Sequence, residues 1–210
     1  MRERARQAAE PAFSISIDNA SVTRFASRFS FTFTDAQKRA VNAITDDFKN
    51  EHPMSRLLEG DGGSGKTAVA ATTAYSVATS RPVGQNFDNL QVAYMAPTEI
   101  LATQHFESFI QYFKHLPIQI GLITGSGCRK FPSKVSANRG TLGWTNISRS
   151  QLLRWVANGE IPILIGTHAL IQKSVVFKHL AYVIIDEQHR FGVNQRKALV
   201  RGKTRGLDAD

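Results

Sequence analysis

Apolar and polar positions follow two different periods along the chain. Four short runs are almost continuously apolar, which is typical of strands buried on both faces of a sheet. They cover residues 91–96, 118–124, 163–166 and 182–186. Between the runs, apolar residues recur every three or four positions, which predicts helices at 99–113, 148–158 and 169–172. This alternation favours crossover connections and a mostly parallel sheet covered on both faces.

The N-terminal part of the chain predicts further elements. Residues 13–17 alternate between apolar and polar side chains, as in a half-buried edge strand. Thr34 is followed three residues later by Gln37, a capping-box pattern that predicts the start of a helix. A first core strand is expected at 56–59, and an Ala- and Val-rich helix at 68–78.

One later stretch departs from this alternation of strands and helices. Residues 125–145 are basic and rich in glycine, with Phe131, Val135 and Trp144 as the large apolar side chains. We interpret them as an inserted loop or hairpin. A last helix is predicted at 193–200.

The loop between the strand at 56–59 and the next helix fits the pattern G-x-x-x-x-G-K-[ST]. Its residues are Gly60, Asp61, Gly62, Gly63, Ser64, Gly65, Lys66 and Thr67. In this pattern backbone N–H groups surround phosphates, the lysine reaches the β- and γ-phosphates, and the hydroxyl binds Mg²⁺. The N-terminus of the following helix adds a positive potential. The alternative is an ordinary glycine turn, which does not require a strand before it and a helix after it.

Two acids, Asp186 and Glu187, follow the last apolar run. Ligand sites in open α/β sheets lie at the carboxyl ends of the strands. Beside a phosphate loop, Asp186 can hold Mg²⁺ and Glu187 can polarise the attacking water. An acid pair alone is common, so the prediction depends on its combination with Lys66.

Composition narrows the class of protein. The net charge is +9, and no acid lies between Glu107 and Glu160. This favours a polyanionic partner such as nucleic acid, with a merely solvated basic face as the alternative. One cysteine, Cys128, excludes an internal disulfide framework and fits a reducing cytoplasm. The sequence contains no apolar run of about 20 residues, no secretory signal and no spacing of zinc ligands.

Several ordered motifs resemble one family. Residues 186–193, Asp-Glu-Gln-His-Arg-Phe-Gly-Val, look like the second Walker motif of RecG-type helicases, which are ATP-dependent branched-DNA translocases of superfamily two. Segments 96–102 with Gln104-His105, 122–125 and 166–172 are similar to successive motor motifs of that family, and 33–37 resembles its adenine-reading glutamine motif. The resemblance covers about residues 31–198. Mfd-type translocases share the same plan and are the alternative.

The resemblance implies a fold and a domain plan. The fold is a three-layer α/β, RecA-like P-loop NTPase domain with a central, mostly parallel sheet. Residues 1–30 would form an arm from a preceding wedge domain, and 31–200 the first motor domain with a basic insert at 126–147. Residues 201–210 would lead to a second motor domain. Gly62 stands where the family is expected to carry a bulkier residue.

The resemblance also implies roles for particular residues. Gln37 would pair with the adenine edge and Phe33 would stack on the base, although Gln37 also suits helix capping. His189 would link the nucleotide site to the DNA-facing motifs. The predicted catalytic residues are Lys66, Asp186, Glu187 and His189, and the Mg²⁺ ligands are Thr67 and Asp186.

The expected DNA contacts all lie where a strand ends, and they grip phosphates rather than bases. They are Pro97, Thr98, Thr124, Gly125, Thr167 and His168. The alternatives are plain N-caps for Thr98 and Thr167, and a satisfied core or cap histidine for His168.

Taken together, these features predict the ATP-binding lobe of a helicase that uses ATP and Mg²⁺ to remodel forked or junction DNA in a bacterial cytoplasm, with no membrane association. Its partners would be the second RecA-like lobe and the wedge domain. Without the arginine of that second lobe, the chain is expected to hydrolyse ATP poorly. The rival functions are a small-molecule phosphotransferase and a non-catalytic nucleic-acid-binding module.

Overall fold

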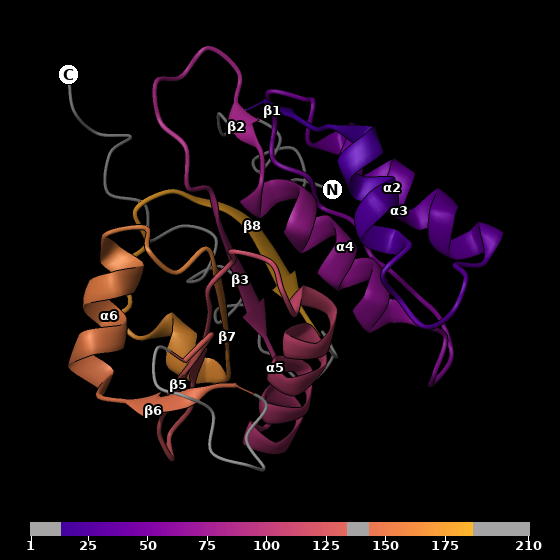
Figure 1. The fold of residues 1–210 in the computed structure, drawn as a ribbon. Coiled ribbons are helices and arrows are strands. Elements are labelled where there is room, and N and C mark those ends of the chain that lie inside the picture. The colour runs from indigo at the N-terminus through magenta and orange to yellow at the C-terminus, as the bar shows by residue number, and fades with distance from the viewer. Residues whose placement is uncertain (1–13, 134–142, 187–210) are drawn as a thin grey trace, which may run out of the picture. The chain divides into compact units, whose positions relative to one another are not determined.

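The structure, a computed structural model, describes residues 14–133 and 143–186 (Figure 1). The helix predicted at 193–200 lies outside these residues. The chain divides into two compact units, residues 1–90 and 91–210. Among the described residues, no helix is long and apolar enough to cross a membrane.

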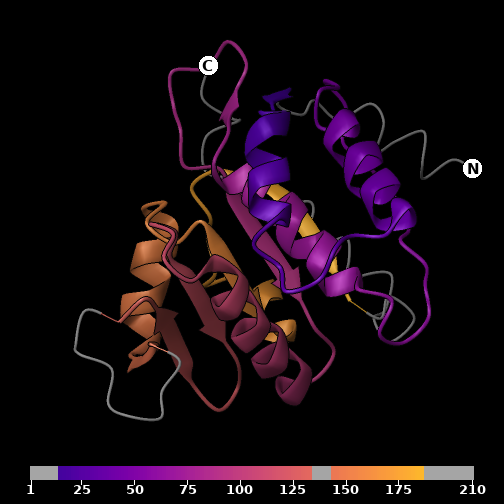
Figure 2. The ribbon, with the colours of Figure 1, turned by 45° about the vertical axis from the view of Figure 1, so that its right-hand side comes forward.

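The first unit is mainly helical. Helices α2 (Asn19–Ala26) and α3 (Asp35–Asp47) both pack against α4 (Lys66–Ala78), and Figure 2 shows the three helices together. Two short strands, β1 (Ile15–Ser16) and β2 (Arg81–Pro82), pair antiparallel. Nine of the thirteen residues of α4 are buried, which makes this helix the centre of the unit.

The start of α3 confirms the capping box. The Thr34 hydroxyl accepts a hydrogen bond from the Gln37 backbone N–H, and the Gln37 Oε1 accepts one from the Thr34 backbone N–H at 2.9 Å. Two backbone donors at this helix terminus therefore have side-chain partners.

The predicted strand at 56–59 is wrong. The described residues between α3 and α4 form no strand, and the side chain of Leu57 is 63% exposed. A strand forms only where a neighbouring strand satisfies its backbone groups. Two leucines between Arg56 and Glu59 bury too little apolar surface to fix an extended segment on their own.

The second unit contains a six-stranded sheet in the order β6-β5-β4-β7-β3-β8. Its strands are β3 (Gln91–Met95), β4 (Ile120–Ile123), β5 (Cys128–Phe131), β6 (Thr145–Ile147), β7 (Ile163–Gly166) and β8 (Leu180–Ile185). β4, β7, β3 and β8 are parallel, whereas β5 and β6 extend the sheet as antiparallel strands. The prediction of a mostly parallel sheet is confirmed, and the basic insert contributes a pair of antiparallel edge strands.

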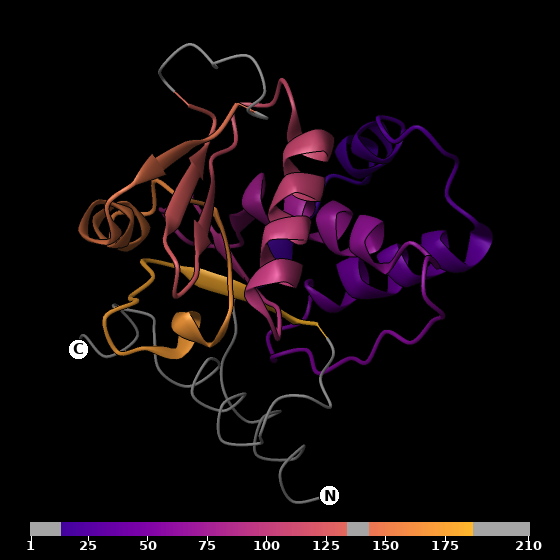
Figure 3. The same cartoon turned by 90° about the horizontal axis from the view of Figure 1, so that it is seen from below.

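Helices cover both faces of this sheet (Figure 3). Helix α5 (Glu99–Phe113) packs on β4 and β7, on one face. Helix α6 (Arg149–Ala157) and the 3₁₀ helix η1 (His168–Ile171) pack on the other face around a cluster that includes Leu152, Leu164 and Leu170. The unit therefore has three layers, as predicted.

A buried glutamine holds the second face together. Gln91 is fully buried, and its Nε2 donates to the carbonyl oxygens of Val156 at 3.0 Å and Ile161 at 2.9 Å. Its Oε1 accepts from the backbone N–H groups of Lys178 at 2.7 Å and His179 at 3.0 Å. One amide thus bonds four backbone groups, from the end of α6, the segment before β7 and the segment before β8.

We predict that Gln91→Met lowers the free energy of unfolding by on the order of 3 kcal/mol, because it removes the side-chain partner of the Ile161 carbonyl and of the Lys178 and His179 N–H groups. Urea unfolding followed by circular dichroism measures the change. Gln111→Met, at an exposed position of α5, is the matched control and should shift stability by less than about 0.5 kcal/mol. Equal stability losses in the two variants would contradict this role of Gln91.

Candidate functional site

The glycine loop at 60–67 is shaped for an anion. Gly63 and Gly65 have φ angles of +77° and +79°, a left-handed conformation that side chains rarely adopt. Gly65 is also the N-cap of α4; no side chain caps this helix and no acid lies in its first turn. The Lys66 and Thr67 N–H groups are therefore available to phosphate oxygens, whereas the Ala68 N–H donates to the Gly65 carbonyl at 3.0 Å.

Gly62, where the family is expected to carry a bulkier residue, has open space around it. A Cβ atom at Gly62 would meet nothing within 4 Å, and its φ is not left-handed. A bulkier residue would fit, so glycine is not required there by the backbone.

Lys66 lies inside the loop. Its Nζ donates to the carbonyl oxygens of Gly60 at 2.6 Å and Asp61 at 2.9 Å, and lies 3.4 Å from the Ser64 hydroxyl. The ammonium group is thus held by the loop that would wrap the phosphates. A phosphate oxygen would take the place of one or more of these neutral acceptors.

Gln37 ties α3 to the loop. Its Nε2 donates to the Ser64 carbonyl at 2.8 Å, while its Oε1 accepts from the Thr34 N–H. The capping role considered for Gln37 is therefore present, and the amide additionally holds the phosphate loop. An adenine edge would have to share or replace these two bonds.

The aromatic side chains beside Gln37 are not equally accessible. Phe33, the predicted stacking residue, is only 7% exposed and packs edge-on against Phe29. Phe31 is 43% exposed and stacks on Phe33 with 5.9 Å between ring centroids and 10° between planes. Sequence reasoning missed Phe31, although its spacing of two from Phe33 was a signal that both rings lie on one side of an extended segment.

The predicted DNA contacts of the second unit follow the carboxyl ends of three adjacent strands. Thr98 follows β3, Thr124 follows β4 and Thr167 follows β7. Because these strands are parallel neighbours, their ends lie along one edge of the sheet.

The hydroxyls at this edge already have local partners. Thr98 accepts from the Leu101 N–H at 3.2 Å, and Thr167 accepts from the Ala169 N–H at 3.5 Å, so the N-cap alternative holds for both. Thr124 donates to the Gly127 carbonyl at 3.1 Å. Thr98 is exposed, whereas Thr124 and Thr167 are 4% and 1% exposed.

The other predicted residues of this edge differ in exposure. Gly125 and His168 are exposed, and Pro97 is half-buried. Contacts with a large ligand are therefore open to Thr98, Gly125 and His168 rather than to the buried threonine side chains.

An acid also lies at this edge. Glu99 accepts a hydrogen bond from the Ser126 backbone N–H at 3.2 Å. Hydrogen bonds from the Ser126 side chain, and then from the backbone of Gly125 and Ser126, lower the pKa of Glu99 below its usual value. The carboxylate thus holds the loop after β4, a role that the sequence analysis did not assign.

The basic insert is partly folded into the protein. Lys130 is 5% exposed, and its Nζ donates to the Pro132 carbonyl at 3.1 Å. Arg129 lies over the Trp144 ring, 4.3 Å from Cζ to the ring centroid. Lys130 is therefore the one buried side chain among the described basic residues of the acid-free span.

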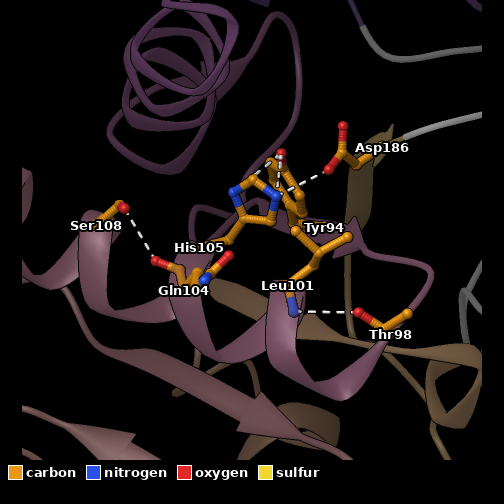
Figure 4. A network of polar contacts seen from close by, with 7 residues as sticks. All are labelled: Tyr94, Thr98, Leu101, Gln104, His105, Ser108 and Asp186. Atoms are coloured by element: carbon orange, nitrogen blue, oxygen red, sulfur yellow. Dashed lines mark hydrogen bonds and ion pairs between the residues drawn. The ribbon is translucent and has the colours of Figure 1, made fainter. Parts of the chain in front are cut away.

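Asp186 directly follows β8, and its side chain meets a histidine of α5 (Figure 4). The His105 Nε2 lies 2.8 Å from the Asp186 Oδ2, and the two side chains are 13% and 24% exposed. The sequence places His105 in a segment that resembles a motor motif of the family, but it assigns this histidine no role. Glu187 and His189 lie outside the described residues.

The described residues contain no cluster of three or more His, Cys, Asp or Glu side chains that could hold a metal ion. Mg²⁺ in nucleotide sites is bound by one or two protein ligands together with phosphates, rather than by a full protein cage. A carboxylate such as that of Asp186 is a ligand of this kind.

Comparison with known proteins decides the family. Residues 34–208 match the family described as DEAD/DEAH box helicase. The chain belongs to this family. Family membership implies the use of ATP with a divalent metal ion.

The individual relatives show which helicases within the family the chain is similar to. The chain is 41% identical over 94% of its length to the ATP-dependent DNA helicase RecG of Aquifex aeolicus, and 43% identical over 91% to that of Bacillus subtilis. It covers 22% and 24% of these helicases, so it spans about a quarter of their length. The predicted resemblance to RecG-type helicases is confirmed.

Solved structures agree with this assignment. A RecG bound to a three-way DNA junction superposes with a TM-score of 0.71 and 34% identity, over 91% of this chain and 23% of that one. A helicase structure from Sulfolobus tokodaii, described as a hypothetical ATP-dependent RNA helicase, gives a TM-score of 0.54 at 16% identity, over 87% of this chain and 46% of that one. The second match supports the RecA-like helicase fold alone.

We predict that Gly65→Ala weakens nucleotide binding about tenfold, because a side chain at a φ of +79° costs roughly 1–3 kcal/mol and would press on the Gln37 amide. Titration with a fluorescent ATP analogue measures the affinity. Gly62→Ala is the matched control, since its Cβ has open space. Equal affinities of the two variants would contradict the proposed loop geometry.

Proposed function

We propose that this chain is the ATP-binding motor lobe of a RecG-type helicase that remodels forked or junction DNA in recombination and repair. The observation that carries the proposal is the anion-shaped loop at 60–67 in a chain that is more than 40% identical to RecG helicases over nearly its whole length. The proposal treats residues 31–200 as one motor domain, with 1–30 and 201–210 leading to a wedge domain and a second lobe.

In this proposal the nucleotide is ATP with Mg²⁺. The N–H groups of residues 60–67 surround the phosphates, and Lys66 replaces its loop carbonyls with β- and γ-phosphate oxygens. Thr67 and Asp186 bind Mg²⁺, an assignment that rests on their sequence motifs. The metal neutralises charge that develops on the transferred phosphoryl group.

Glu187 and His189 complete the proposed chemistry. Glu187 orients and polarises the attacking water, and His189 connects the nucleotide to the DNA-facing motifs. Catalysis by such a site consists of positioning and electrostatic stabilisation, which is why an arginine from the second lobe contributes about 10³-fold or more. The chain by itself is therefore proposed to turn over ATP poorly.

Adenine recognition is assigned to Gln37 and its aromatic neighbours. The Gln37 amide offers a donor and an acceptor side by side. The exposure of Phe31, and its stacking on the buried Phe33, support Phe31 as the ring that meets the base, with Phe33 as its support.

DNA binding is proposed at the strand-end edge. Pro97, Thr98, Thr124, Gly125, Thr167 and His168 would form it, with backbone N–H groups and the exposed members contacting phosphates. Contacts of this kind position duplex DNA without reading its sequence, as a translocase requires. A cytoplasmic location belongs to the same proposal and is supported by the single cysteine and the bacterial relatives.

A second candidate is a non-catalytic nucleic-acid-binding module, favoured by the acid-free span between Glu107 and Glu160. DNA affinity that falls with salt but survives Lys66→Ala, without any ATP turnover when the second lobe is supplied, would favour it.

The proposal is tested by steady-state ATP hydrolysis with and without a forked DNA, using Lys66→Ala as the control. The isolated chain should show no turnover above the control. Adding a separately expressed second lobe should produce DNA-stimulated turnover that Lys66→Ala abolishes. Absence of ATP binding by the chain, together with no turnover after the second lobe is added, would overturn the proposal.

We predict that Phe31→Ala weakens ATP binding by about tenfold while leaving thermal stability nearly unchanged, since base stacking on an exposed ring is worth roughly 1–3 kcal/mol. Phe33→Ala should instead lower the melting temperature, because it removes a buried ring. Both are read by nucleotide titration and thermal unfolding. A stable Phe31→Ala chain with normal affinity would exclude Phe31 as the stacking ring.

A further inference from the structure

The contact between His105 and Asp186 links two distant parts of the second unit. The residues are 81 positions apart, one in the second turn of α5 and the other directly after β8. The 2.8 Å distance between Nε2 and Oδ2 is that of a strong hydrogen bond between a charged acceptor and its donor. An ionised carboxylate only accepts, so the hydrogen is on the histidine Nε2.

The histidine ring also contacts a buried tyrosine. Tyr94 of β3 is 3% exposed, and its hydroxyl oxygen lies 3.5 Å from both ring nitrogens of His105. The two rings are 4.7 Å apart between centroids with a tilt of 41°, and Tyr94 in turn packs edge-on against Phe109 of α5. Figure 4 shows the rings of His105 and Tyr94 next to each other, with the Asp186 carboxylate beside them. The imidazole therefore has little room to rotate.

Tyr94 stays a neutral phenol in this arrangement. Burial, and then the negative charge of Asp186, raise the pKa of Tyr94 above its usual value. No second negative charge is therefore placed beside Asp186 by this ring.

The backbone of Asp186 is fixed as well. Its N–H donates to the Met95 carbonyl at 2.9 Å, which continues the pairing of β3 with β8 by one residue. With the backbone held by β3 and one carboxylate oxygen held by His105, the direction of the carboxylate is determined by two independent bonds.

We propose that His105 is a positioning residue that fixes the Asp186 carboxylate for binding of the divalent cation that accompanies the nucleotide. The proposal rests on the function proposed above, in which Asp186 is a Mg²⁺ ligand. A carboxylate held in one orientation loses less rotational freedom when it binds the metal, and a hydrogen bond from a second group is a common means of holding a metal ligand.

Helix α5 connects His105 to a proposed DNA contact. The same helix begins at its N-cap Thr98, a proposed DNA contact, and His105 lies seven residues further, about 10 Å along the axis. A single rigid helix thus carries a DNA-facing end and the group that orients Asp186. A shift of α5 on DNA would move the His105 donor relative to the carboxylate.

The test is the Mg²⁺ dependence of nucleotide binding, measured with the chain and a fluorescent ATP analogue titrated in Mg²⁺ and in EDTA. Three variants are compared: His105→Phe keeps a ring but has no donor, His105→Gln keeps an N–H donor, and Asp186→Asn is the reference for loss of the ligand. Thermal unfolding of each variant gives a separate measure of stability.

The expected result is that His105→Phe raises the Mg²⁺ concentration needed for half-maximal binding about tenfold. Its affinity in EDTA should equal that of the unchanged chain, and His105→Gln should restore most of the Mg²⁺ response. A merely structural role would instead weaken binding equally in Mg²⁺ and in EDTA, with no recovery in His105→Gln.

Different results would contradict the role of His105 and the role of Asp186. If Asp186→Asn loses the Mg²⁺ response while His105→Phe keeps it, or if the structural pattern is found, the positioning role of His105 is overturned and the nucleotide site stands. If Asp186→Asn keeps the response, or if the unchanged chain shows none, the assignment of Asp186 as metal ligand fails.

Discussion

The in-register pairing of four parallel strands sets the geometry of the second unit. Ile123, Gly166, Met95 and Ile185 are paired across β4, β7, β3 and β8, so these strands end in a single row. The residues that follow each strand therefore lie along one edge, although they are separated by tens of residues in the sequence. The row also requires glycine at one point: a Cβ on Gly166 would lie 2.5 Å from the Ile123 carbonyl oxygen, a backbone atom.

The features that the sequence predicted correctly depend on local chemistry. Helix α5 begins at Glu99 and ends at Phe113, as the apolar spacing and the Thr98 cap indicated. The glycines of the phosphate loop were recognised because their spacing encodes a backbone conformation. The strand at 56–59 failed because a strand depends on a partner, which two apolar residues do not specify.

The features that the sequence did not reveal depend on contacts between distant residues. In the sequence, Gln91 is recognisable only as the first residue of a buried strand. Its four hydrogen bonds join it to residues 65 to 88 positions away. The role of His105 follows the same rule: the sequence places it in a motif that resembles the family, but its partner Asp186 is 81 positions away. Both would require knowledge of the strand order.

The polar side chains of the candidate site already have hydrogen-bond partners within the chain when no ligand is bound. Lys66 is held by loop carbonyls, Gln37 by Thr34 and Ser64, and the strand-end threonines by local backbone groups. Ligand binding then exchanges hydrogen bonds instead of satisfying unpaired groups, and each exchange contributes only about 0.5–1.5 kcal/mol. The exchange of hydrogen bonds therefore adds little net free energy to nucleotide binding.

Two arginines in the acid-free span between Glu107 and Glu160 have neutral partners. Arg129 lies over the neutral Trp144 ring, and Arg149 donates to the Gln172 amide oxygen at 2.6 Å. Among the described residues, neither arginine forms an ion pair with a carboxylate. Their partners orient the guanidinium groups without neutralising them, so the positive potential of this region persists in the folded chain. Such a surface attracts a phosphate backbone through long-range electrostatics and needs no contact with the bases.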